Sequence, residues 1–178
     1  MFLDEAVSLL PPPDEPFSSD GGAWRDLESA LRVRLPGSFK AFADRYGPGM
    51  VDDHIRIYHP LAGRFWNLGE EMRERTDAYA TIWPQLEFPL TAGTAVGDVL
   101  YWGDTDHGIV LFFRIDGDDP DAWPIIEQAD DSYEDSELGF GDWLLRYLRG
   151  GGSRGHFVRN VHAVDGEPVR PRFRRIVS

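Results

Sequence analysis

Apolar residues recur every three or four positions in the first third of the chain, which is the spacing of a buried helix face. A short helix is predicted before the prolines at 11–13, which must end it. Trp24, Leu27 and Leu31 form a second stripe, and Asp20 is the predicted N-cap of that helix. After the break at Leu35-Pro36, aromatic residues repeat at helical spacing until the glycines at 47 and 49. We therefore expect two short helices joined by a tight bend.

The pattern changes to the alternation of a β-strand over residues 54–58 and returns to a partial helical stripe over 68–82. From residue 96 to 126 it is rich in strands separated by turns of Gly and Asp. Residues 109–113 are apolar at consecutive positions, which predicts a central strand covered on both faces, whereas Pro124 fits an edge strand or a strand start. A closing amphipathic helix is expected over about 139–149.

This order of elements predicts an α+β fold, with N-terminal helices packed on a mostly antiparallel sheet and a closing helix after it. Residues 1–150 are expected to form one domain, which includes an N-terminal helix and a Pro-rich linker over 1–22. Residues 151–178 form a basic extension that still contains many apolar side chains. Asp165-Gly166 offers a turn there, so we expect a hairpin docked on the domain.

Charge is distributed unevenly along the chain, whose formal net charge is -13. Residues 98–142 contain 14 acidic side chains and a single basic one, Arg114, whereas residues 143–178 contain two acidic and eight basic ones. A strongly acidic surface repels phosphate backbones, which argues against broad nucleic-acid binding. The arginines of the tail either dock on the acidic domain, which we favour, or contact a partner.

The sequence lacks the residues that several kinds of chemistry require. The chain has no cysteine, which excludes disulfides, thiolate zinc sites and a cysteine nucleophile. Neither a Gly-x-Ser-x-Gly elbow nor a phosphate-binding loop is present, so we expect a protein that is not an enzyme and needs no cofactor. Neither a signal peptide nor a membrane span is recognisable, and the expected location is the cytoplasm.

Two groups of acidic residues could be considered as metal ligands. Asp116, Asp118 and Glu127 follow part of the calcium-binding EF-hand spacing, but Pro120 and Asp121 stand where that loop needs a ligand and a glycine. Asp104, Asp106 and His107, together with His54 or His59, could be ligands of a hydrolytic metal, although their spacing matches no established motif. We expect no metal site at either place.

The helical segments also resemble a known family. Trp24-Arg25-Asp26-Leu27-Glu28, Leu35-Pro36, Phe39-Lys40, Phe42 and Tyr46-Gly47-Pro48-Gly49 are similar in order and spacing to the signature of the SUKH superfamily. That superfamily includes Smi/Knr-type regulators and many bacterial immunity proteins. The resemblance covers about residues 20–150. Its motif residues are expected to be structural, and they are Trp24, Leu27, Glu28, Leu35, Pro36, Tyr46, Gly47 and Gly49.

The resemblance implies an α+β domain without a catalytic centre that neutralises a cognate polymorphic toxin by direct binding. Such toxins are often nucleases or deaminases with basic clefts, which an acidic protein can occupy. The candidate partner-binding residues are Asp104, Asp106, Asp116, Asp118, Asp119, Asp121, Asp130, Asp131, Glu134 and Asp135. Two alternatives remain, namely a regulatory or scaffolding module of the same fold without a toxin partner and, less favoured, a metal-dependent hydrolase.

Overall fold

The computed structural model describes residues 1–151, 158, 163–164 and 167–176, and the chain folds there as a mixed α+β protein. The α-helices in these residues are α1 (Phe2–Leu9), α2 (Gly22–Leu31), α3 (Gly37–Tyr46), α4 (Leu68–Ile82) and α5 (Phe140–Leu148). The strands are β1 (Gly49–Val51), β2 (Ile55–Ile57), β3 (Val99–Asp104), β4 (Val110–Arg114), β5 (Ile125–Ala129), β6 (Ser132–Asp135), β7 (Ala163–Val164), β8 (Glu167–Pro168) and β9 (Phe173–Arg175).

Two antiparallel sheets form the centre of the molecule. One has the order β3-β4-β5-β6, and the other has the order β2-β1-β9. A single antiparallel bridge between Ile55 and Thr105 joins β2 to the end of β3, so the two sheets meet along that edge. The β1–β2 turn and the β3–β4 turn are consequently neighbours, although they are far apart in the sequence.

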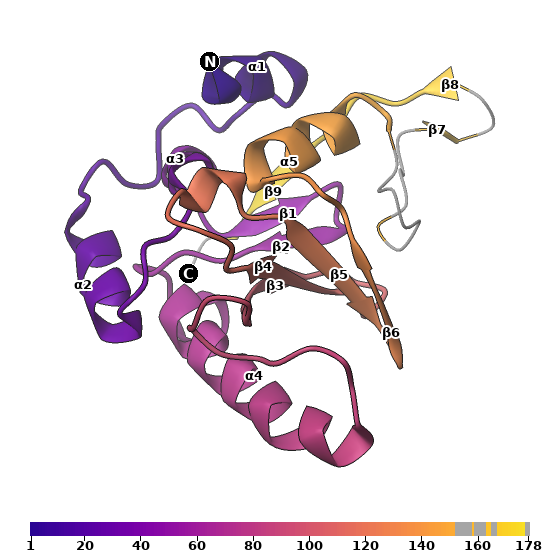
Figure 1. The fold of residues 1–178 in the computed structure, drawn as a ribbon. Helices are drawn as coiled ribbons and strands as arrows, with labels where there is room; N and C mark the ends of the chain where they lie inside the picture. The colour runs from indigo at the N-terminus through magenta and orange to yellow at the C-terminus, as the bar shows by residue number, and fades with distance from the viewer. Residues whose placement is uncertain (152–157, 159–162, 165–166, 177–178) are drawn as a thin grey trace.

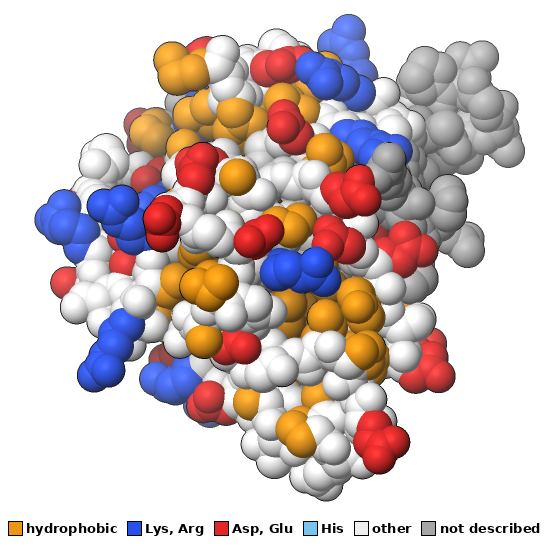
Figure 2. Space-filling model, in the orientation of Figure 1, with side chains coloured by type: hydrophobic (Ala, Val, Ile, Leu, Met, Phe, Trp, Pro, Cys, Tyr) orange, Lys and Arg blue, Asp and Glu red, His pale blue; other side chains and the backbone are white. Residues whose placement is uncertain are grey.

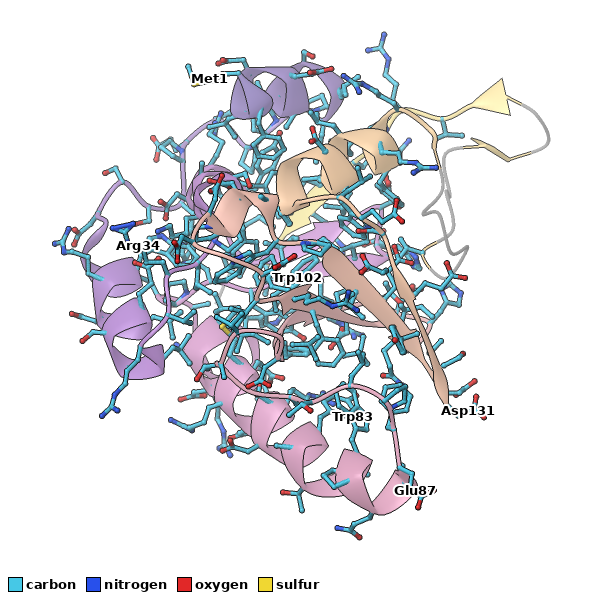
Figure 3. All side chains as sticks on the ribbon, viewed as in Figure 1. Met1, Arg34, Trp83, Glu87, Trp102 and Asp131 are labelled. Atoms are coloured by element: carbon cyan, nitrogen blue, oxygen red, sulfur yellow. The ribbon has the colours of Figure 1, made fainter. Side chains whose placement is uncertain are left out.

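Helices cover both faces of the four-stranded sheet (Figure 1). On one face, Phe112 packs against Tyr79 and Trp83, with ring centroids 5.3 and 5.4 Å apart, which places α4 there. On the other face, Phe113 packs 5.5 Å from Phe39 of α3, and α5 lies beside α3. Trp102 is fully buried at the centre of these layers (Figure 3). The expected α+β class, with helices packed on antiparallel sheet, is therefore confirmed.

The bend between α2 and α3 is held by contacts of the helical motif residues. Glu28 accepts a hydrogen bond from the Leu35 backbone nitrogen at 2.8 Å and pairs with Lys40 Nζ at 2.6 Å. The predicted N-cap of α2 was one residue too early, because Gly21 occupies that position. The Asp20 carboxylate still accepts a hydrogen bond from the Gly22 nitrogen, so it satisfies one free backbone donor from just outside the helix.

Most long elements lie where the periodicity predicts them. α4 covers residues 68–82, α5 follows the predicted closing helix, and β4 is an interior strand with three consecutive buried residues. β5 begins directly after Pro124, which agrees with the prediction that this proline marks the start of a strand. β1 and β6 were not predicted, because they are only three and four residues long and their sequences carry no alternating apolar pattern.

The C-terminal segment pairs with the domain through β9, which forms an antiparallel ladder with β1. At Gly49 the chains are so close that a Cβ atom would lie 2.3 Å from the Arg174 carbonyl oxygen, which explains a glycine there. Strands β7 and β8 also pair with each other. The predicted turn residues Asp165 and Gly166 lie outside the described residues, as do Arg154 and Arg159.

Candidate functional site

The sheet topology divides the ten candidate partner-binding acids among three places. Asp104, Asp106, Asp130 and Asp131 lie at the end formed by the β3–β4 and β5–β6 turns. Asp116, Asp118, Asp119 and Asp121 lie at the opposite end, in the β4–β5 connection, and Glu134 and Asp135 lie on the edge strand β6. Strand β4 alone separates the two ends by about 13 Å. The ten acids therefore do not form one continuous face.

Three of these acids are engaged in holding the fold together. Asp121 binds the N-terminus of α3, because its carboxylate accepts hydrogen bonds from the Ser38 nitrogen at 2.8 Å and from the Gly37 nitrogen at 3.1 Å. Asp119 accepts a hydrogen bond from the Asp121 nitrogen, and Asp135 forms an ion pair with Arg114. These contacts leave Asp119, Asp121 and Asp135 less available to a partner.

Four of the other acids are exposed and form no ion pair with a described residue. They are Asp116 and Asp118, which we call the 116/118 turn, and Asp130 and Asp131, which we call the 130/131 turn. Asp131 lies at the outer tip of the β5–β6 hairpin (Figure 3). Figure 2 shows acidic side chains over much of one face of the molecule.

Asp104 is the centre of a buried polar network that links the two sheets. Asp104 is only 7% exposed, and its carboxylate forms an ion pair with Arg56 of β2. The same carboxylate accepts hydrogen bonds from Tyr101 Oη at 2.8 Å and from Tyr58 Oη at 3.3 Å. A buried carboxylate is tolerated when such donors surround it. Asp104 therefore has a structural environment rather than that of a free surface acid.

Burial raises the pKa of Tyr58 to about 12, and the nearby negative charge of Asp104 acts in the same direction. Burial also raises the pKa of Tyr46, Tyr101 and Tyr147. The folded protein therefore holds these phenolic protons more tightly than the unfolded chain does, so the stability they contribute is complete below pH 10 and is lost as the pH rises further. For Tyr58 the loss falls between pH 10 and about 12.

We expect alkaline unfolding to coincide with tyrosine ionisation. Phenolate absorbance and far-UV circular dichroism, recorded together from pH 8 upward, should change in the same pH range. Tyr58→Phe should make the fall of unfolding free energy with pH shallower, because one proton fewer is released on unfolding. Phenolate absorbance that is complete while the circular dichroism stays native would contradict this expectation.

His54, Asp106 and His107 come together at the meeting edge of the two sheets. The Asp106 nitrogen donates a hydrogen bond to the His54 carbonyl oxygen at 2.9 Å, and the Asp106 carboxylate contacts the Nδ1 atoms of both histidines. The two Nδ1 atoms lie 3.3 Å apart. Burial alone would raise the pKa of Asp106, but the hydrogen bond and charge of His54, with His107, lower it below its ordinary value.

The other described histidine has ordinary core contacts. His59 is fully buried, its Nε2 atom lies 2.9 Å from the Asp44 carboxylate, and its Nδ1 atom accepts a hydrogen bond from the Leu61 nitrogen. Trp24 donates to the same Asp44 oxygen. Both ring nitrogens of His59 are thus satisfied, and of the two histidines considered from the sequence only His54 joins Asp106 and His107.

The EF-hand spacing is not realised in the fold. Glu127 is 1% exposed within β5 and accepts hydrogen bonds from Trp143 Nε1 at 2.8 Å and from the Val158 nitrogen at 3.0 Å. Asp116 and Asp118 lie in the exposed connection before that strand. Because Glu127 is held by core donors, these three acids do not surround one cation.

The basic tail contacts acidic residues of the β1–β2 turn. Arg174 pairs with Asp53, and the Arg172 nitrogen donates to Asp52 at 2.8 Å. Arg175 donates to the carbonyl oxygens of Tyr46 and Glu15. Arg174 through its side chain and Arg172 through its backbone nitrogen thus contact acidic residues of the same chain, while Arg170 is exposed.

Comparisons with protein-family models, with curated proteins and with solved structures gave no match to this chain. Within the described residues, no helix has both the length and the apolar character needed to cross a bilayer.

Proposed function

We propose that the chain is a non-catalytic immunity protein of the SUKH type, which neutralises a cognate toxin by binding it through exposed acidic turns. The observation that carries this proposal is the acid-rich four-stranded sheet, whose 116/118 and 130/131 turns expose carboxylates that form no ion pair with a described residue. The toxin would be basic at the contact, as a nuclease or deaminase cleft is.

The charge distribution supports binding rather than simple solubility. The 98–142 segment has one basic residue, Arg114, and that residue is already paired with Asp135. Its exposed acids therefore produce a negative electrostatic potential at each end of the sheet. Such a field raises the association rate with a basic partner and makes that rate sensitive to salt.

The contacts of the motif residues agree with the structural role that the resemblance implies. Trp24 packs on Phe39 and bonds Asp44, and Glu28 fixes the bend between the helices. Tyr46 donates a hydrogen bond to the Leu10 carbonyl oxygen at 2.6 Å. These residues build the framework that presents the turns, so the binding residues are to be sought elsewhere.

The proposal is tested by co-expressing the chain with the protein encoded by the neighbouring gene. We expect the chain to restore growth of cells that produce that protein and to form a complex with it, measured by calorimetry. Growth that stays inhibited, with no measurable complex, would contradict the proposal.

Charge reversal identifies which turn makes the contact. The variants D116K/D118K and D130K/D131K should be compared with E74K/D77K, which makes the same charge change on the exposed side of α4. We expect at least one turn variant to weaken the complex on the order of tenfold and to reduce its salt dependence, with little change in E74K/D77K. Equal effects of all three variants would show that only net charge matters.

A further inference from the structure

The side chains of His54, Asp106 and His107 bring three possible metal ligands together, which no other group of His, Asp and Glu side chains does among the described residues. Two imidazole nitrogens and one carboxylate oxygen lie within 4.8 Å of one another. In the Asp44 and Glu127 sites, by contrast, each carboxylate meets hydrogen-bond donors such as indole and backbone N–H groups. The three ligand atoms come from two turns that the bridge between Ile55 and Thr105 brings together.

We propose that His54 Nδ1, the Asp106 carboxylate and His107 Nδ1 form a binding site for Zn²⁺. Imidazole and carboxylate ligands suit zinc, whereas calcium and magnesium prefer sites made of oxygen atoms. The 3.3 Å between the two Nδ1 atoms matches the separation of about 3.3 Å that two Zn–N bonds of about 2.0 to 2.1 Å subtend at a tetrahedral angle. The Asp106 carboxylate oxygen lies closer, 2.7 Å from His107 Nδ1, so it must move outward to take the third ligand position.

The surrounding structure restrains His54 and the turn that carries Asp106 and His107 before any ion binds. His54 is 4% exposed, so its ring has little freedom, and its carbonyl oxygen is bonded to the Asp106 nitrogen. The turn carrying His107 is closed by hydrogen bonds from the Gly108 nitrogen to the Thr105 carbonyl and from the Ile109 nitrogen to Thr105 Oγ1. Preorganised ligands on rigid elements lower the cost of binding a metal.

One side of the cluster is open to solvent, because the His107 side chain is 72% exposed and that of Asp106 is 39% exposed. Three protein ligands then leave the remaining coordination position of the zinc to water. The zinc ligands include no residue of the 116/118 turn or the 130/131 turn, so the zinc proposal and the toxin proposal are tested independently.

The test is a calorimetric titration of Zn²⁺ into the chelator-treated full chain. We expect one ion per chain, and we expect His107→Ala and Asp106→Asn each to weaken binding at least tenfold. The His107 side chain is exposed, so His107→Ala should keep the thermal midpoint of the metal-free protein. Asp106→Asn also weakens the contact with buried His54, so it is judged by Zn²⁺ binding at a temperature well below its own thermal midpoint. Mg²⁺ and Ca²⁺ should give no comparable binding.

The matched control is the double variant H156A/H162A, which removes the two histidines that lie outside the described residues. It should bind Zn²⁺ as the unaltered chain does. Long-range ¹H–¹⁵N spectra add a second readout, because zinc should shift the Nδ1 resonances of His54 and His107 and leave those of His59 unchanged. Absence of binding, binding unaffected by His107→Ala, or binding lost in H156A/H162A would overturn the proposal.

Discussion

Replacing Asp104 by alanine should lower the free energy of unfolding by about 3 kcal/mol. The change removes the acceptor of two phenolic hydroxyls, those of Tyr58 and Tyr101, and leaves Arg56 without its partner at the junction of the two sheets. The Arg56 side chain is 36% exposed, so water offsets part of the loss, and the expected cost lies at the lower end for a broken buried pair. Urea unfolding of the variant and the unaltered chain measures the difference.

A matched control for this prediction is Asp135→Ala. Asp135, on the edge strand β6, also pairs with an arginine, Arg114, but both side chains are 28% exposed. This substitution should cost less than about 1 kcal/mol, because water replaces the lost partner. If Asp104→Ala were as mild as Asp135→Ala, the buried network would not be stabilising, and Asp104 would return to the set of acids available for a partner.

The contrast between Asp104 and the exposed acids illustrates what composition can and cannot predict. The 14 acids of residues 98–142 could be counted from the sequence, and they predicted an acidic surface. Their positions depend on strand topology, which places the 116/118 turn and the 130/131 turn at opposite ends of the sheet. The role of Asp121 likewise depends on a contact with Ser38, 83 positions earlier, that no local pattern encodes.

The helices and the longer strands could be predicted because their apolar periodicity is a local property. α4 agrees with its prediction at both ends, since Asn67 precedes it as a capping residue and its charged positions follow a helical stripe. The pairing of β1 with β9 joins residues more than 120 positions apart, and neither strand exceeds three residues. A strand this short is set by its neighbours in the sheet rather than by its own sequence.

The candidate site was predictable only in part for the same reason. Asp106 and His107 are adjacent in the chain, so the sequence could suggest them together. His54 lies 52 positions away from Asp106, and its proximity follows from the bridge between Ile55 and Thr105. From the sequence alone, His59 was an equally good candidate, and only the fold shows that Asp44 and the Leu61 nitrogen already satisfy it.

Replacing Phe39 by alanine should have the largest effect of the substitutions considered, about 4 kcal/mol of unfolding free energy. Phe39 is fully buried, and its ring contacts those of Trp102, Phe113 and Phe140 at centroid distances of 5.6, 5.5 and 5.1 Å. It also packs against Trp24 of α2. One side chain thus connects α2 and α3 to the sheet and to α5, and its removal leaves a cavity that several rigid rings cannot fill together.

The control for this substitution is Phe65→Ala, at a side chain that is 78% exposed and should change stability by less than about 0.5 kcal/mol. Urea unfolding followed by tryptophan fluorescence compares the two variants, since Trp24 and Trp102 both contact Phe39. A small effect of Phe39→Ala would mean that the helices and the sheet are held together by other contacts. A large effect would show that the aromatic side chains of α3 hold the N-terminal helices, the sheet and α5 together.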